Sequence, residues 1–299
     1  MVAFINEDQS KFVDVDSDRF STALNMNDDE DEDNKYADDE SDRTTSRLLD
    51  SLCLDEPFFA VSAANESSTL QLAHVHKNTS RLSTKGILTL MNHCEGLREL
   101  SLSYSFLSEE LLEALSSNKS SLLQLDTLRV EAHPDAKPAS TVSCEAWCAF
   151  ATHFSNINFI LLAYLTEVKD YEALLQSYVP LTHLYFGEEA PSSAIARVGE
   201  RCPRLGELVV GAYGPETADC ALLSIARGCP KLTALGLGDC EITCSAFVEF
   251  VAICREHLQV LYVSDTSLIE DSDYDVDKVA ARVSALLGRP WQPNYVPYW

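Results

Sequence analysis

The sequence predicts an α/β solenoid in which short parallel strands alternate with helices. A short apolar phrase recurs along the chain after residue 48, and the segments between its copies show the apolar spacing of helices. Successive copies begin 21 to 32 residues apart, which is about the length of one strand followed by one helix. We therefore expect one stacked array over residues 48–287, with strands on the inner side and helices outside.

The recurring phrase has the form Leu-x-x-Leu-x-Leu, with other apolar residues in some copies. Its second and third apolar positions alternate with exposed positions, as in a strand that buries one face. This is the pattern of leucine-rich repeats. The clear copies are Leu97-Leu100-Leu102, Leu125-Leu128-Val130, Ile157-Ile160-Leu162, Leu181-Leu184-Phe186, Leu205-Leu208-Val210, Leu232-Leu235-Leu237 and Leu258-Leu261-Val263, and the weaker ones are Leu49-Leu52-Leu54 and Leu70-Ala73-Val75.

Residues between the inward positions should line the concave face of the solenoid, where such proteins bind other proteins. Most exposed side chains are merely solvated, so only some of these residues are expected to contact a partner. Tyr185 and Tyr262 are the two that we select as partner-binding candidates. The full set is Arg98, Glu99, Ser101, Thr127, Arg129, His183, Tyr185, Glu207, Val209, Thr233, Gly236, Val260 and Tyr262.

The ten cysteines are interpreted as reduced, mostly buried thiols. Four of them, Cys94, Cys202, Cys229 and Cys254, occupy the same position of their repeats, three or four residues before the phrase, so they do not gather into a metal site. Two pairs with a four-residue spacing, Cys144 with Cys148 and Cys240 with Cys244, are also expected to be core thiols. We expect no metal site and no disulfide.

The formal net charge of −25 argues against nucleic acid as a partner and favours a basic protein surface. Residues 28–42 hold ten acidic residues and one basic residue, Lys35, so residues 1–47 are predicted to be an acidic, largely disordered segment.

The longest apolar run, Phe159 to Leu165, is too short to cross a membrane, and we expect a protein of the nucleus and cytoplasm.

Catalytic motifs were sought and not found. The sequence holds no nucleophile elbow, no zinc-protease motif, no phosphate-binding loop and no dinucleotide-binding fingerprint, and its seven histidines are scattered. We therefore predict a protein that is not an enzyme and that needs no cofactor.

The last twelve residues, 288–299, are predicted to form an extended tail that projects from the solenoid. Gly288 is a plausible helix stop, and three prolines favour extended backbone. Trp291 is equally compatible with a cap on the last repeat and with insertion into a partner. For Trp299 we favour insertion into a partner, because aromatic anchors commonly dominate binding energy. The candidate partner-binding residues of the tail are Trp291, Tyr295, Pro297, Tyr298 and Trp299.

Several long segments resemble the family of F-box/leucine-rich-repeat protein 3. The resemblance covers residues 48–299 and extends beyond generic repeat patterns, above all in CSAFVEFV (residues 244–251) and in the Trp-ended tail. The segments are HCEGLRELSLSYSFLSEELLEALSS (93–117), LTHLYFGEEA (181–190), RVGERCPRLGELVVGA (197–212), GLGDCEITCSAFVEFV (236–251) and LLGRPWQPNYVPYW (286–299).

The resemblance implies a substrate-recognition subunit of an SCF-type (Skp–cullin–F-box) ubiquitin ligase. It further implies a cryptochrome-like client from the circadian clock, held by the repeats while the C-terminal tail enters its flavin pocket. In such proteins an F-box of roughly forty residues precedes the repeats and binds the Skp-type adaptor, which joins the cullin. Residues 1–47 contain nothing similar. The alternative is therefore an interaction protein that binds the same client without coupling to a ligase, and Skp and cullin are expected partners only where an F-box lies upstream.

Overall fold

The computed structural model describes residues 3–5, 12–14, 72–75, 87, 97–117, 125–211, 217–238 and 240–294. The chain divides into two units, residues 1–52 and 53–299. In the first unit, β1 (Ala3–Ile5) and β2 (Phe12–Asp14) pair in antiparallel fashion. The acidic run at residues 28–42 and the predicted boundary near residue 48 lie outside the described residues.

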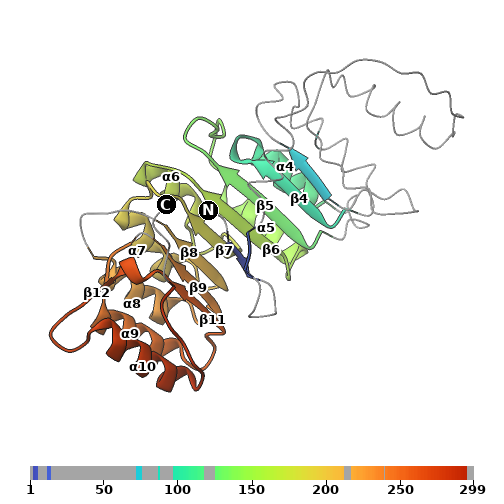
Figure 1. The fold of residues 1–299 in the computed structure, drawn as a ribbon. Coiled ribbons are helices and arrows are strands. Elements are labelled where there is room, and N and C mark those ends of the chain that lie inside the picture. The colour runs from blue at the N-terminus through green and yellow to red at the C-terminus, as the bar shows by residue number, and fades with distance from the viewer. Residues whose placement is uncertain are drawn as a thin grey trace, which may run out of the picture. The chain divides into compact units, whose positions relative to one another are not determined.

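The second unit is built on an eight-stranded parallel sheet whose strands follow one another in chain order (Figure 1). A short parallel pair, β10 (Ile242–Thr243) with β12 (Leu268–Ile269), lies outside this sheet. The strands of the sheet are β3 (Leu72–Val75), β4 (Glu99–Ser103), β5 (Thr127–Ala132), β6 (Asn158–Ala163), β7 (Leu181–Phe186), β8 (Glu207–Val210), β9 (Ala234–Leu237) and β11 (Val260–Val263).

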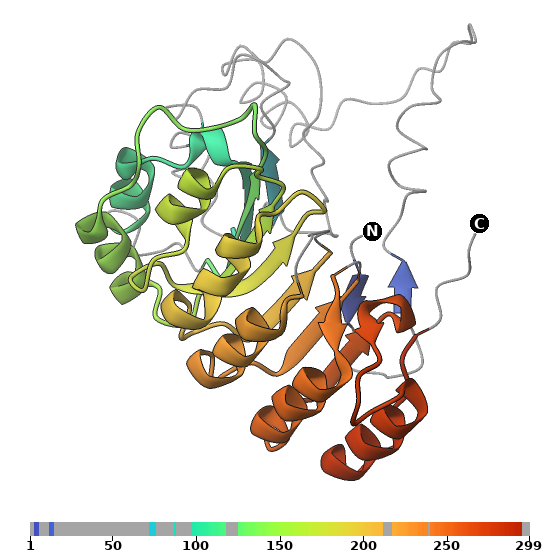
Figure 2. The ribbon, with the colours of Figure 1, turned by 90° about the vertical axis from the view of Figure 1, so that its left-hand side faces the viewer.

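Helices cover one face of this sheet and leave the other, the open face, to the strands (Figure 2). Each helix returns the chain to the start of the next parallel strand. This strand–helix alternation confirms the predicted leucine-rich-repeat solenoid. The helices are α4 (Glu109–Leu115), α5 (Cys144–His153), α6 (Val168–Leu174), α7 (Ser192–Arg201), α8 (Asp219–Gly228), α9 (Cys244–Cys254) and α10 (Val276–Leu287), with short 3-10 turns η2 (Tyr104–Phe106) and η4 (Asp265–Ser267). None of these helices has the length and apolar character needed to cross a bilayer.

The core lies between the sheet and the helices and is made by the phrase residues. Leu97, Leu100 and Leu102 are at most 1% exposed, and their counterparts in later repeats are buried in the same way. Side chains from the strand-to-helix connections cap some of the helices: the oxygens of Ser108 and Ser143 accept hydrogen bonds from Leu111 N and Ala146 N, whereas α6, α7 and α8 have no side-chain cap. Repeated apolar burial is therefore the feature that the repeats share.

For the copy of the phrase in β6, the predicted inward positions are wrong by one residue. In β6, Phe159 and Leu161 point to the core, and the predicted inward residues Ile160 and Leu162 align instead with Arg129 and Glu131 of β5 on the open face. The pairing of β6 with β7 also shifts register between Phe159 and Ile160. The reason is that residues 159–163 are apolar throughout, so their pattern does not distinguish the two faces of the strand.

The predicted ladder of buried thiols is present between sheet and helices. Cys202, Cys229 and Cys254 are at most 2% exposed, and the Cys229 thiol donates a weak hydrogen bond to the carbonyl of Val198 at 3.7 Å. Burial raises the pKa of Cys202 and of Cys229 to about 12. These thiols behave as small apolar side chains.

The interpretation of Cys144 and Cys148 as core thiols is wrong. Both are exposed on α5, with their sulfurs 3.8 Å apart, while Ala146, Trp147 and Phe150 form the buried side of that helix. Cys240 and Cys244, the other pair, are buried as expected. The four-residue spacing places two residues on one face of a helix, but it does not tell which face is buried.

We expect maleimide to separate the two classes of thiol at neutral pH. Cys144, Cys148 and Cys220 are exposed and should react within minutes. A thiol with a pKa near 12 is ionised in roughly one molecule in 10⁵ at pH 7, so Cys202 and Cys229 should react only after unfolding. Timed labelling followed by peptide mass spectrometry measures this order, and equal rates for Cys220 and Cys229 would contradict it.

Candidate protein-interaction surface

Strand pairing arranges the side chains of the open face in rows that cross the sheet. One row runs from Ser101 through Arg129, Ile160, His183 and Glu207 to Ala234 and Val260. The next row runs from Ser103 through Glu131, Leu162, Tyr185, Val209 and Gly236 to Tyr262. Most of the predicted concave positions are in these rows. Glu99 and Thr127 pair with each other at the start of β4 and β5, and Arg98 precedes β4. Thr233 precedes β9 and bonds to the carbonyl of Gly206.

Polar and aromatic side chains gather at the middle of this face. We call Arg129, Glu131, Tyr164, His183, Tyr185 and Glu207 the central cluster. Tyr185 donates a hydrogen bond of 2.8 Å from its phenol to Glu207 Oε1, and Arg129 lies 3.6 Å from a carboxylate oxygen of Glu131. The structure therefore brings Tyr185, one of the two selected strand tyrosines, into a bonded network in which its side chain is 92% buried.

The electrostatics of the cluster follow from partial burial beside carboxylates. Burial, and then the charge and hydrogen bond of Glu207, raise the pKa of Tyr185, so its phenol stays protonated. Burial lowers the pKa of His183, although the nearby Glu207 opposes this shift. The His183 Nδ1 atom lies 2.8 Å from Thr182 Oγ1. At neutral pH, Glu207 is thus flanked by an uncharged phenol and an uncharged imidazole.

Tyr164 projects from the end of β6 and is the most exposed aromatic residue of the described chain, at 37%. Its ring stacks on His133 with centroids 4.7 Å apart and planes inclined by 11°. On the neighbouring strand, a Cβ atom at Gly187 would lie 2.9 Å from Tyr164 Cδ1, so the glycine leaves the room that the ring occupies. The ring is therefore held in place while part of it remains open to a partner.

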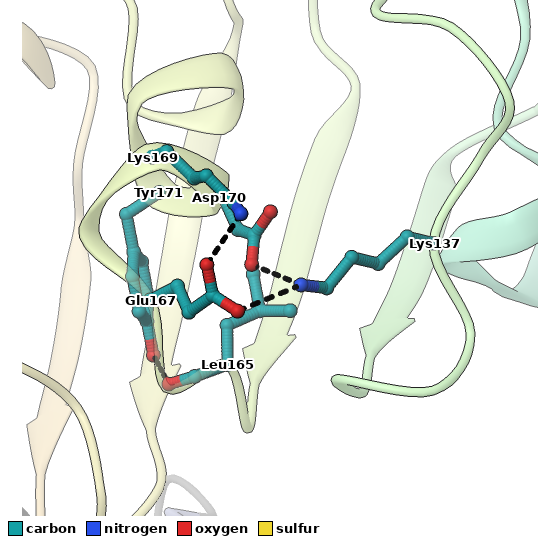
Figure 3. A network of polar contacts seen from close by, with 6 residues as sticks. All are labelled: Lys137, Leu165, Glu167, Lys169, Asp170 and Tyr171. Atoms are coloured by element: carbon teal, nitrogen blue, oxygen red, sulfur yellow. Dashed lines mark hydrogen bonds and ion pairs between the residues drawn. The ribbon is translucent and has the colours of Figure 1, made fainter.

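Ion pairs fix the connections beside Tyr164 (Figure 3). Lys137, in the loop after β5, contacts Asp170 of α6 and lies 4.0 Å from Glu167, which also pairs with Lys169 at 2.6 Å. Below them, Tyr171 donates to the carbonyl of Leu165 at 2.8 Å. These contacts join the loop after β5 to the loop after β6. They therefore fix the backbone beside Tyr164, which follows β6.

The first part of the tail folds back onto the last repeat, contrary to the prediction that it projects. Asn294 donates from its backbone to the carbonyl of Val263 at 2.8 Å and accepts from Asp265 N at 3.0 Å. It forms a parallel bridge with Ser264. Gly288 ends α10 in the left-handed conformation, with φ of 67°, as expected. Tyr295, Pro297, Tyr298 and Trp299 lie outside the described residues.

Of the two roles left open for Trp291, the structure favours the cap. Its indole packs on Phe247 with centroids 5.4 Å apart and donates from Nε1 to the carbonyl of Leu261 at 2.9 Å. Its backbone N–H donates to Ser284 Oγ at 2.9 Å. Trp291 therefore joins α9, α10 and β11.

Tyr262, the other selected strand tyrosine, is half-buried on the open face of β11, in the same row as Gly236.

We expect Trp291→Ala to lower stability rather than to act on binding alone. The change removes the contact with Phe247 and leaves the carbonyl of Leu261 without its indole donor, at a cost of about 2–3 kcal/mol. Chemical denaturation measures the loss, and Gln292→Ala is the control because Gln292 is exposed. An unchanged midpoint for Trp291→Ala would show that the indole does not stabilise the last repeat.

The prediction from sequence missed Glu131, His133 and Tyr164 as residues of this surface. The predicted strand positions stop with the six-residue phrase, at Val130 and Leu162. The backbone pairing of β5 with β6 continues for about two residues beyond these positions, so the later residues were not counted as part of the strands. The backbone pairing continues past the strands, with Tyr164 N donating to the carbonyl of Ala132. Extending the strand alternation by two residues beyond Val130 would have found Glu131.

The comparison with curated proteins gives relatives over most of the chain. F-box/LRR-repeat protein 21 of Mus musculus is 39% identical over 249 residues, and the proteins of the same name from Bos taurus and Ovis aries are each 37% identical. All three of these relatives are F-box/LRR-repeat proteins. The match covers 82% of this chain and 56% of each relative, so the chain spans about half of their length. No family model matches the sequence.

These relatives support the resemblance seen in the sequence at the level of F-box proteins with leucine-rich repeats. They carry the name of protein 21, so they do not single out the family of protein 3. Within the described residues, no group of three or more His, Cys, Asp or Glu side chains is placed to hold a metal ion. The chemistry that the described surface offers is that of hydrogen bonds, charge and aromatic contact.

Proposed function

We propose that this chain recognises a protein client for an SCF-type ubiquitin ligase, without performing a covalent step itself. The observation that supports this most directly is the match to F-box/LRR-repeat proteins over 82% of the chain. The fold adds a physical basis, because one face of the sheet bears a preformed polar and aromatic cluster beside a stable core. Rigid, partly exposed aromatic and charged groups are typical of protein-binding surfaces.

The proposed client is a cryptochrome-like protein, bound by the open face and by the tail, whose degradation would serve circadian regulation in the nucleus and cytoplasm. Tyr295, Pro297, Tyr298 and Trp299 supply the tail contact, and Tyr185, Tyr262 and the central cluster supply the face. The tail leaves the solenoid at Asn294, beside Ser264 at the end of β11. Both contact areas thus belong to the second unit of the chain, and one client can engage them together.

A second candidate function is client binding without ligase coupling. Residues 1–47 are acidic and do not resemble an F-box, so ligase coupling requires an F-box elsewhere in the protein. Such a protein would shield the client or compete with a receptor that carries an F-box.

Affinity purification from cells tests the proposal and separates the two candidates. The tagged chain should recover a cryptochrome, and recovery of Skp and cullin as well would favour ligase coupling, whereas cryptochrome alone would favour the second candidate. A variant with Tyr164→Ala and Tyr185→Phe should recover less client, while its melting temperature reports any loss of fold. Absence of cryptochrome from the wild-type eluate would contradict the client assignment.

A further inference from the structure

We propose that Glu207, at the centre of the open face, is the anchor for a cationic side chain, arginine or lysine, of the bound client. The inference rests on the proposed function in that it takes the open face as the client surface. The neighbours of Glu207 and the charges around it indicate the chemistry of that contact.

Glu207 is a carboxylate whose described neighbours leave its charge uncompensated. Its side chain is 17% exposed, so it has lost most of its contact with water. Oε1 accepts one hydrogen bond, from the Tyr185 phenol, and Oε2 lies 3.9 Å from His183 Nε2, too far for a hydrogen bond. Because burial lowers the pKa of His183, this imidazole is neutral at pH 7 and supplies no positive charge.

The one guanidinium of the cluster is engaged elsewhere. Arg129 lies 3.6 Å from Glu131, and strands β6 and β7 separate it from Glu207 in the register of the sheet. Glu188 and Glu189, which follow β7 after Gly187, are exposed. A partially desolvated carboxylate gains most from a charged donor that approaches within hydrogen-bond distance.

On the side of Glu207 away from His183, the neighbouring positions of the sheet carry small side chains. Across the sheet, Glu207 aligns with Ala234 of β9, and the next residue of that row is Val260. In the following row, Val209 aligns with Gly236. Small side chains therefore stand on β9 where β7 carries a histidine and a tyrosine, and we expect the cationic side chain to approach Glu207 from this side.

The test compares the affinity of purified cryptochrome for wild type and for Glu207→Gln. The amide keeps the acceptor for Tyr185 and removes only the charge, so the melting temperature should change little while affinity falls roughly ten- to a hundredfold. The wild-type affinity should also fall more steeply with salt than that of the variant. Glu256→Gln is the matched control, because it makes the same charge change at an exposed turn after α9. Equal affinities for wild type and Glu207→Gln would overturn the inference.

A second measurement does not depend on the client. A peptide of alternating glycine and lysine is joined to carboxylates by a zero-length carbodiimide, and the sites are mapped by mass spectrometry. Links should form at Glu207 in preference to Glu110 and Glu256, which are exposed on α4 and just after α9. Even labelling of all three would overturn the inference. Preferred linking together with no binding of cryptochrome would support a cationic anchor while rejecting the client named above.

Discussion

Gly228→Ala should destabilise the solenoid by about 3 kcal/mol or more, the largest effect that we expect of any single methyl group in this chain. Helices α7 and α8 approach so closely that a Cβ atom at Gly228 would overlap the carbonyl oxygen of Gly199. A Cβ atom at Gly199 would overlap the backbone and side chain of Ser224. Because the atoms met at Gly228 are backbone, no rotamer change relieves the clash, and the two helices must separate.

Chemical denaturation followed by circular dichroism measures this loss. Gly206→Ala is the matched control, since a Cβ there would meet only ordinary contacts of 3.6 and 3.7 Å. Separation of α7 from α8 would also move β7 relative to β8, and with them the contact between Tyr185 and Glu207. Client affinity should therefore fall with stability in Gly228→Ala and stay unchanged in Gly206→Ala. A midpoint for Gly228→Ala equal to that of wild type would contradict the close approach of the helices.

The repeat phrase predicted the strands well because burial recurs at fixed positions. Leu100 aligns with Leu128 across β4 and β5, and Leu208 aligns with Leu235 across β8 and β9, as the phrase requires. The prediction was wrong at β6, where an uninterrupted apolar run gives no alternation. A pattern of polarity reports a face only where the two faces differ.

Contacts between repeats were beyond prediction from the sequence for a physical reason. The approach of Gly199 to Gly228 and the stacking of His133 on Tyr164 depend on how neighbouring repeats are stacked, and local spacing does not encode that stacking. The tail shows the same limit. Pro290 and Pro293 indicated extended backbone correctly, but the position of that backbone against β11 depends on Trp291 and its donor bond to Leu261.

The candidate site was predicted in part. Arg129, His183, Tyr185 and Glu207 were assigned to the concave face from alternation alone, and strand pairing places all four on the open face. Their bonding was not predictable, because the contact of Tyr185 with Glu207 joins residues on two strands of different repeats. Alternation assigns a residue to a face, whereas the register between strands decides which residues meet.

Trp299→Ala should weaken the binding of cryptochrome by at least about thirtyfold and leave the melting temperature unchanged. Burial of an indole in a partner contributes roughly 2–3 kcal/mol from area alone, and packing in a pocket adds to it. The solenoid holds the base of the tail, since Asn294 is bonded to Val263 and Asp265. A fixed base and stiff proline-containing chain lower the ordering cost of binding, and five residues of extended backbone reach about 15 Å from it.

Two further variants separate a binding tail from a structural cap. Deletion of residues 295–299 should match or exceed the loss in Trp299→Ala but retain weak binding, because the open face supplies a second contact area. Trp291→Ala, in contrast, should lower the melting temperature, because that indole is held by Phe247 and Leu261. Titration calorimetry and thermal denaturation of the same samples give both quantities. If Trp299→Ala keeps full affinity, or loses stability as Trp291→Ala does, then the end of the tail covers the last repeat of the solenoid and does not reach into a client.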